Sequence, residues 1–447
     1  MTLPTEPLEL HRALGPVLAT DSAPAWHGPR WWWNGPLDVE GLALGSALAV
    51  AAAVERRTLS TSSELVNASF NSIGHLRVDG RAAEGWAPLS GFKATADGWV
   101  RLHANYPHHA KKLLTALELE SGDQLEDALL ERTATEVEDV VTAAGGVASA
   151  VRTPDEWAGS PMGEAARSHP WIEFVTDAGR PTDTMRILDL TRVIAGPSAT
   201  RLLGALGADV LRVDPPQLPE LTDQHIDTGF SKRSALADLR DRAQLARIRQ
   251  LLAEADVVVL GYRSSALARF GLDPVSLRAD YPDLVVASVN AWGRTGPWAD
   301  ARGFDSIVQA ATGIAHLYGA NRGGSWRPGA LPVQALDHAT GLGIAAAVLA
   351  LLRARREGVT GRAHLSLATT AAMLMGFPPP PSGGVELEIP HRSVESDYGL
   401  LDYVPPVLEP LEYMHPPVRY GSSVLEWVSA SATAENRQVT AEPRISG

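Results

Sequence analysis

Short apolar runs alternate with helical patterns from Met185 onward, and this alternation constrains the fold more than any other feature of the chain. Strand–helix alternation at this spacing is typical of a parallel sheet with helices on both faces. We therefore predict an α/β fold with a Rossmann-like parallel sheet. The expected strands are Met185–Leu190, Val210–Val213, Val257–Leu260 and Leu284–Val289, and the expected helices between them are Ala199–Leu206 and Asp241–Ala255.

The rest of the chain divides by composition. Trp99–Ala104 has the pattern of a strand, and Ala110–Leu117, Gln124–Leu130 and Ala134–Ala144 have that of helices, which predicts a smaller α+β domain. The polar stretch Thr176–Thr184 is the expected linker. We predict four segments: an irregular arm (1–36), a helix followed by the smaller domain (37–180), the parallel-sheet domain (185–375) and a proline-rich tail, poorly structured or wrapped on another surface (376–447).

Composition excludes several functions. The formal net charge is −13, from 39 basic and 52 acidic residues, which disfavours nucleic acid and anionic membranes as partners. Cysteine is absent, so disulfides, thiolate metal sites and a cysteine nucleophile are excluded. His103, His108 and His109 lack the spacing of metal ligands, and no metal is expected. The apolar runs Gly41–Val54 and Gly341–Leu352 are too short to span a bilayer, so we predict a soluble, cytoplasmic protein.

The chain contains one candidate repeat. Leu37-Asp38 matches Leu336-Asp337 at an offset of 299 residues, and each pair precedes a long alanine-rich helix that ends in two arginines. We interpret this as an internal duplication, although alanine-rich helices also resemble one another by composition. Gly341–Ala346 matches the G-x-G-x-x-A pattern but lies inside the second of these helices, so it predicts close helix packing rather than a nicotinamide site.

Candidate chemical groups follow the first strands. A Gly-Pro turn at 196–197 joins a strand to a helix, and the N–H groups of Ala195 and Gly196 could hold an oxyanion; an ordinary βα loop is the alternative. The basic residues Arg212, Lys232 and Arg269 fall near strand ends, where α/β sheets bind ligands, and they suggest a phosphate-bearing ligand or, individually, a solvated surface.

Asp337 starts a long apolar helix, where a catalytic carboxylate and a simple helix N-cap are the two interpretations.

The order of these motifs resembles class III CoA-transferases, the carnitine dehydratase/bile-acid-inducible protein F family that includes formyl-CoA transferase. The resemblance runs in one pass from Met185 to Leu374, through Asp189–Pro197, Leu206–Asp214, Lys232–Ser234 and Gly303–Gly313. Residues 85–175, through Gly91–Val100 and Gly146–Val151, resemble the smaller, later domain of the same family. The two halves of the family therefore stand here in inverted order, with the aspartate helix present in both.

The resemblance implies a mechanism and a set of residues. Asp337 would be the nucleophile that attacks an acyl-CoA thioester, forming an aspartyl anhydride and then an aspartyl-CoA thioester, before CoA passes to a small carboxylic acid. Arg212, Lys232 and Arg269 would face the CoA phosphates, on the sheet edge that carries Asp337 and Ala195. The nucleotide and pantetheine path would be lined by Val193, Tyr262, Asn290 and Trp292. The family also implies a homodimer, in which the chains can interlock.

Three alternatives accompany this reading. Asp38 competes with Asp337, because its flank also resembles the start of a helix. A related racemase branch uses a histidine where this chain has Phe304, which cannot transfer a proton, so racemase or isomerase activity is disfavoured. The altered stretch Gly261–Ser265 leaves open a CoA-binding partner without catalysis.

Overall fold

A seven-stranded sheet forms the centre of the computed structural model, which describes residues 8–19, 24–55, 58–85, 87–182, 184–381 and 383–428. Six strands are parallel and the edge strand β8 is antiparallel. Every strand expected from the sequence is present. In spatial order the strands are β11 (Arg233–Leu236), β10 (Asp209–Asp214), β9 (Arg186–Leu190), β12 (Val257–Leu260), β13 (Val285–Asn290), β16 (Val359–Ser366) and β8 (Glu173–Ala178).

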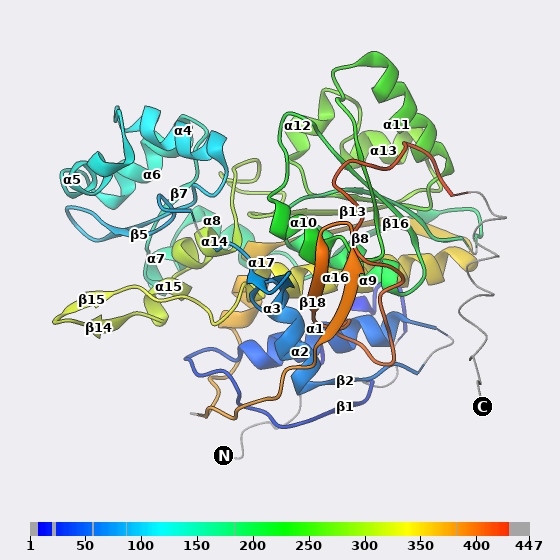
Figure 1. Ribbon diagram of the computed structural model, residues 1–447, viewed down its shortest axis with the longest axis horizontal. Helices are drawn as coiled ribbons and strands as arrows, with labels where there is room; N and C mark the ends of the chain where they lie inside the picture. Colours follow the sequence, from blue (N-terminus) through cyan, green and yellow to red (C-terminus); the bar gives the residue numbers. More distant parts are fainter. Residues whose placement is uncertain are drawn as a thin grey trace.

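Both faces of this sheet are buried, because alternate strand residues enter two separate cores. Ile187, Val257 and Val285 pack against α9 (Ala195–Ala205) and α16 (Ala335–Arg356), whereas Leu188 and Val258 pack against helices on the opposite face. Those helices are α11 (Arg242–Glu254), α12 (Ser264–Ala268) and α13 (Pro274–Asp280), drawn above the sheet in Figure 1. The predicted α/β class with a Rossmann-like parallel sheet is confirmed.

The two halves of the candidate repeat lie side by side. Helix α1 (Val39–Ala53) packs along α16, and Arg353 Nη1 reaches the carbonyls of Ala52 and Ala53 at the C-terminal end of α1. Helix α16 is long and apolar enough to cross a membrane, but most of it is buried inside the fold, as expected of a core helix. A Cβ on Gly341 would overlap the Ala195 carbonyl, and one on Gly343 would overlap Leu365 and Trp171, so the glycines serve helix packing, as predicted.

A smaller α+β unit lies to the left of the sheet in Figure 1. Its core contains Val100, Leu113 and Val141 and is separate from the two cores of the large sheet. The chain returns to the large sheet through α7 (Pro154–Ala158) and α8 (Pro161–Arg167). The unit comprises β5 (Gly91–Ala94), β6 (Trp99–Leu102), β7 (Ala148–Ala150), α4 (Pro107–Ala116), η2 (Gly122–Gln124), α5 (Leu125–Leu130) and α6 (Ala134–Ala143).

Two predicted boundaries need correction. The expected linker Thr176–Thr184 begins inside β8, because Val175 and Thr176 pair with β16 at the sheet edge. The proline-rich tail is ordered over 383–428: β17 (Arg392–Ser396) and β18 (Gly399–Tyr403) form a sheet with β3 (Arg77–Val78) and β4 (Arg81–Ala82). Val407 and Leu408 bury their side chains in the main core, so this part of the tail wraps the large unit. Residues 429–447 lie outside the described residues.

The remaining elements connect these layers. The arm before α1 contains η1 (Leu10–Leu14) and β1 (Trp26–His27), which pairs in parallel with β2 (Thr61–Ser62). The others are α2 (Ser63–Phe70), α3 (Ser72–His75), α10 (Thr222–Thr228), α14 (Asp305–Thr312), α15 (Ile314–Leu317), β14 (Ala320–Arg322), β15 (Ser325–Arg327) and α17 (Leu367–Met375). Helix α14 matters most for the site, since it lies between the small unit and α16.

Candidate active site

Asp337 lies in the first turn of α16, and its side chain does not cap that helix. The N-cap is Gln334, which makes no side-chain capping bond, so the N-cap interpretation of Asp337 is wrong. Asp337 is 7% exposed, deep for an ionisable residue. A buried carboxyl group that does not cap its own helix is a candidate for a chemical role rather than for stabilising the helix.

A second carboxyl group, Asp305, holds the start of α16. Asp305 Oδ2 accepts a hydrogen bond from the Asp337 N–H at 3.0 Å, and Oδ1 accepts one from Gln309 Nε2. Gln309 Oε1 in turn accepts the Leu331 N–H at 2.8 Å, which fixes the loop that leads into α16. Asp305 therefore positions the backbone of Asp337 from a neighbouring helix. Because 32 residues separate the two aspartates, no sequence pattern indicates this role.

Burial and mutual repulsion make this acid pair resist ionisation. Desolvation raises the pKa of Asp305 to about 6, and desolvation together with the charge of Asp305 raises the pKa of Asp337 well above its usual range. The Arg101 guanidinium, from β6 of the small unit, favours the ionised form of Asp305. The two carboxyl groups therefore titrate as a pair, with one proton retained well above the pH at which an exposed aspartate loses it.

The small unit covers this acid pair. Phe304, the residue before Asp305, stacks face to face on His103, with ring centroids 3.8 Å apart and planes 3° apart. Burial lowers the pKa of His103 to about 3, so the imidazole is neutral and a poor base. A histidine is thus near the acid pair, although the sequence assigned it no role, and its low basicity argues against proton abstraction at this position.

The expected oxyanion donors lie on α9, whose start is next to that of α16 with Asp337. Ala195 and Gly196 are the first two residues of α9, whose N–H groups have no partner within the helix. Gly341, one turn after Asp337, packs against the Ala195 carbonyl, so the start of α9 and the start of α16 are adjacent. Val193 adopts a positive φ of 69° and donates its N–H to Glu220 Oε2 at 2.8 Å, which fixes the loop before α9.

Two of the three expected phosphate ligands are buried inside the protein. Arg212 is 1% exposed and pairs with Asp214 at 2.7 Å and Glu220 at 3.0 Å. Lys232 is 2% exposed and pairs with Asp189 at 3.2 Å. Since their charges are already matched by buried acids, these side chains stabilise the sheet and do not face a groove with Asp337. This corrects the expectation that both reach a phosphate.

The other predicted binding residues lie near the loops after the strands. Arg269 is exposed at the end of α12, with its guanidinium 4.7 Å from the Phe270 ring. Asn290 exchanges two hydrogen bonds with the Gly293 backbone, at 2.7 and 2.8 Å, and so shapes the loop after β13. Trp292 is buried and donates to the Arg302 carbonyl, and Tyr262 is half-buried after β12.

Four cations gather where the small unit meets the sheet, and no sequence pattern indicated them as ligand-binding residues. Lys112 comes from α4, and Arg192, Arg263 and Arg302 come from the loops after β9, β12 and β13. A side chain at Gly145 would meet both Lys112 Nζ and an Arg302 amine, which shows how close these two cations lie. Burial and the nearby arginines lower the pKa of Lys112 and of Arg302. Asp300 bonds Arg263, and Glu220 lies 3.7 Å from Arg192.

This four-cation cluster (Lys112, Arg192, Arg263 and Arg302) fits an anionic ligand. Like charges held together in a chain of net charge −13 cost free energy unless an anion joins them. Because the cluster lies at the carboxyl ends of the parallel strands, it has the place and charge expected for the phosphates of CoA. No single segment carries more than one of these residues, so sequence spacing gave no signal for the cluster.

Asp38 has a structural role instead. Its side chain caps α1 by accepting the Gly41 N–H at 2.8 Å, and it pairs with Arg30 at 2.7 Å. The nearby Glu40 accepts the backbone N–H groups of Trp31 and Trp33. The interactions of Asp38 are thus those of a helix cap. Among the described residues, no group of three or more histidine, aspartate or glutamate side chains could hold a metal ion.

Comparisons with known proteins agree with this picture over the second half of the chain. The profile of CoA-transferase family III matches residues 183–400. A succinate–glutarate CoA-transferase of Agrobacterium fabrum is 34% identical over 197 residues, which are 40% of this chain and 48% of that protein. A succinyl-CoA:glutarate CoA-transferase of Mus musculus is 33% identical over 195 residues, 41% of this chain and 44% of that protein.

The likeness to solved structures is partial. The crystal structure of Rv3272 from Mycobacterium tuberculosis is 32% identical, covers 44% of this chain and 56% of its own, and has a TM-score of 0.40. A CaiB/BaiF family protein from Brucella suis is 27% identical, covers 50% of this chain and 65% of its own, and has a TM-score of 0.38. The chain spans about half the length of the curated relatives named above.

Proposed function

We propose that this chain, which belongs to CoA-transferase family III through residues 183–400, moves CoA from an acyl-CoA thioester to a free carboxylic acid by way of Asp337. The observation that carries the proposal is the buried carboxyl pair at the start of α16, beside the start of α9. A nucleophilic carboxylate and oxyanion donors on neighbouring helices are the groups that acyl transfer requires.

The chemistry proceeds through two anhydrides. The ionised Asp337 carboxylate attacks the thioester carbonyl and expels CoA thiolate, leaving an anhydride between aspartate and the acyl group. The thiolate then attacks the aspartyl carbonyl, which releases the donor acid and leaves an aspartyl-CoA thioester. The acceptor carboxylate repeats these two steps in reverse, and Asp337 is regenerated. The N–H groups of Ala195 and Gly196 would stabilise the oxyanion of each addition, an effect worth about 3–4 kcal/mol for one donor elsewhere.

The four-cation cluster would hold the CoA phosphates. Burial and the charges of Arg192, Lys112 and Arg302 lower the pKa of His108 on α4. Lys112 and Arg302 both lie beside Gly145, so these cations are close together where the small unit meets the sheet. In this arrangement Arg269 is the one predicted phosphate ligand that keeps its proposed role, whereas Val193, Tyr262, Asn290 and Trp292 shape the path toward Asp337. Since Asp305 and Asp337 are buried and Phe304, next to Asp305, stacks on His103 of the small unit, we expect the small unit to shift when the acyl group enters.

The experiment that tests the proposal measures CoA exchange by mass spectrometry over a panel of acyl-CoA donors and carboxylic acids, starting with succinyl-CoA and glutarate because of the named relatives. Asp337→Ala should abolish exchange while CoA still binds, and hydroxylamine should trap an aspartyl adduct at 337 in the parent. Asp38→Ala is the matched control and should retain exchange. Activity of Asp337→Ala together with loss in Asp38→Ala would move the nucleophile to the first copy.

The same experiment separates the alternative functions. A CoA-binding partner without catalysis would bind CoA but give no covalent adduct with any donor. A racemase would incorporate solvent deuterium at the α-carbon without an acceptor acid; Phe304 and the weakly basic His103 make this the less favoured function.

Two features of the whole protein are also part of the proposal. A homodimer follows from the family resemblance, and light scattering in solution tests it. A cytoplasmic location accords with the burial of α16, and cell fractionation tests it.

A further inference from the structure

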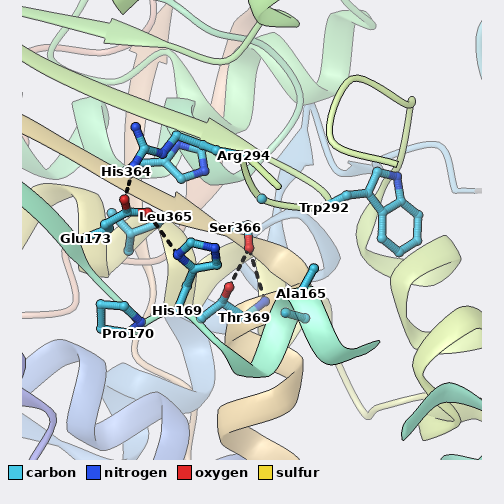
Figure 2. Close-up of a pocket in the computed structure, with 12 residues that line it drawn as sticks. Ala165, His169, Pro170, Glu173, Trp292, Arg294, His364, Leu365, Ser366 and Thr369 are labelled. Carbon is cyan, nitrogen blue, oxygen red and sulfur yellow. Dashed lines mark hydrogen bonds and ion pairs between the residues drawn. The ribbon is translucent and has the colours of Figure 1, made fainter. Parts of the chain in front are cut away.

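A second cluster of titratable groups lines a cavity away from the Asp305–Asp337 pair. Figure 2 shows His169, Glu173, Arg294 and His364 around this space, with Ser366 and Thr369 at its floor and Trp292 to one side. The side chains come from the segment after α8, from β8, from the loop after β13 and from the junction of β16 with α17. We call this space the α8–α17 cavity.

The cavity contains buried hydrogen-bonding capacity that the described residues leave unused. His364 Nδ1 lies 3.0 Å from Ser288 Oγ, while His364 Nε2 is buried with no hydrogen-bond partner among the described residues. The Nε atom of the adjacent Arg362 is also buried without a partner in that part of the chain. A buried polar atom without a partner costs free energy, which a bound polar group would recover.

The charge balance at the cavity favours an anion. Arg294 forms an ion pair with Glu173, which also lies 3.5 Å from His169 Nδ1. The guanidinium of Arg362 is close enough to Arg294 to lower its pKa, in addition to the effect of burial. One arginine and one glutamate thus line the cavity beside two histidines, and the charge of Arg362 lies close behind them. A ligand with a single negative charge would complete the neutralisation.

The size of the cavity limits which chemical groups can bind in it. The space between the side chains is about 270 Å³ including its opening, but the enclosed part has room for only one water-sized group, about 10 Å³. An oxygen atom of a planar carboxylate fits such a recess, and a guanidinium matches a carboxylate edge. A phosphate is larger and carries more charge than the surplus cation could balance.

We propose that the α8–α17 cavity binds the carboxylate of a small organic acid through Arg294 and the Nε2–H of His364. Both ring nitrogens of His169 already have partners, Glu173 and Thr295 Oγ1, so His169 lines the site without binding the ligand directly. In the bound form Ser288 donates to His364 Nδ1, which leaves the proton on Nε2 to face the ligand. Thr369 lines the cavity, and the next residue, Thr370, hydrogen-bonds Thr340 on α16, one turn after Asp337. The site therefore adjoins the helix of the proposed nucleophile without containing it.

The test follows the ring nitrogens of ¹⁵N-histidine-labelled full-length protein by NMR, with the His364 signal assigned from a His364→Gln variant. Addition of sodium acetate or formate at constant ionic strength should move the His364 signal saturably at millimolar concentration. It should also raise the pKa of His364, which burial and the charges of Arg294 and His169 lower to about 3 in the free protein. Glu173 and Arg362 are the other charged groups that face this ring and act on the titration.

Three variants sharpen the test. Arg294→Gln should weaken acetate binding at least about tenfold, because it removes a charge-assisted bond. Arg322→Gln, the same change at an exposed arginine of β14, should leave binding unchanged. Asp337→Asn should bind acetate as the parent does. Acetate binding at this site is therefore tested independently of CoA transfer. An absent or non-saturable shift, an equal response to sodium chloride, a stronger response to phosphate, or an unaffected Arg294→Gln variant would overturn the proposal.

Discussion

At the scale of single residues, the same burial that keeps water from Asp337 opposes the ionisation that its proposed chemistry needs. Asp305 acts on Asp337 in two ways. Its carboxylate accepts the Asp337 N–H and so fixes the backbone, and its negative charge disfavours a second negative charge beside it. This trade-off makes the pH dependence of the reaction the most direct test of the pair.

Asp305→Asn should move the acid limb of the kcat/KM profile to lower pH. The asparagine oxygen can still accept the Asp337 N–H, but the neighbouring negative charge is gone, so the pKa of Asp337 falls and the nucleophile ionises earlier. Rates measured from pH 4 to pH 9 with a saturating acceptor test this. Asp280→Asn, at an exposed acid on α13, is the control and should leave the profile unchanged. An acid limb that stays in place or moves upward would contradict a charge effect of Asp305.

Asp337→Asn should stabilise the fold at pH 7 while it abolishes transfer. The pKa of Asp337 is raised in the folded state, so folding holds a proton that the unfolded chain releases, and stability falls as pH rises from about 4 through the folded pKa. Asparagine cannot ionise, and we expect a gain of about 1–3 kcal/mol at pH 7. Thermal unfolding of both proteins at pH 5 and pH 7 measures it. A lower midpoint for the variant at pH 7 would show that the carboxylate is well stabilised in place.

At the scale of elements, the close approach of α9 and α16 brings the proposed oxyanion donors near the proposed nucleophile. The approach depends on Gly341, since any Cβ there would overlap the Ala195 carbonyl. The glycine pattern that resembled a dinucleotide motif therefore allows α9 and α16 to pack closely.

Gly341→Ala should destabilise the protein by about 1–3 kcal/mol and lower kcat, because the added methyl group pushes α9 away from Asp337. The matched control is Gly98→Ala, where a Cβ would meet no atom within 4 Å. Thermal midpoints and steady-state kinetics compare the two. If Gly341→Ala matched Gly98→Ala in both, the two helices would have to tolerate more separation than the packing indicates.

At the scale of the whole molecule, the site joins two units that fold around separate cores. The small unit contributes His103, Arg101 and Lys112, while the large unit contributes the acid pair and three arginines. Tyr106 from the small unit donates to Glu220 at 2.6 Å, in the network that buries Arg212, and so ties the units together at the edge of the site. In the proposed mechanism, the position of the small unit therefore controls both access to Asp337 and the assembly of the cation cluster.

Lys112→Gln should raise the KM for acyl-CoA by about three- to tenfold, with little change in kcat, because it removes one proposed phosphate contact remote from the reacting carbonyl. Its neighbour Lys111 is exposed, and Lys111→Gln is the matched control. The rise in the parent's KM with salt should be weaker in the Lys112 variant. Equal KM values for the two variants would remove the small unit from CoA binding.

Local sequence patterns predict much of the architecture. The apolar runs of strand length predicted β9, β10, β12 and β13, and the alanine-rich helix with its internal glycines predicted the buried α16. Side-chain periodicity reports burial within one element, so these predictions needed no knowledge of the neighbours. Of the two expectations for the tail, wrapping on another surface fits residues 383–428, but the strands β17 and β18 were not predicted, because β18 pairs with β3, which lies far away in the sequence.

The sequence by itself determined which residues could act, namely the aspartate before the apolar helix and the Gly-Pro turn after the first strand. Only the tertiary structure decided which of them are available. Arg212 and Lys232 have the right charge but are neutralised by buried acids, whereas Arg302 has no special sequence pattern and lies beside Lys112 at the edge of the site. The reason is physical: a charge is visible in one residue, but its electrostatic effect depends on partners that folding brings from distant positions.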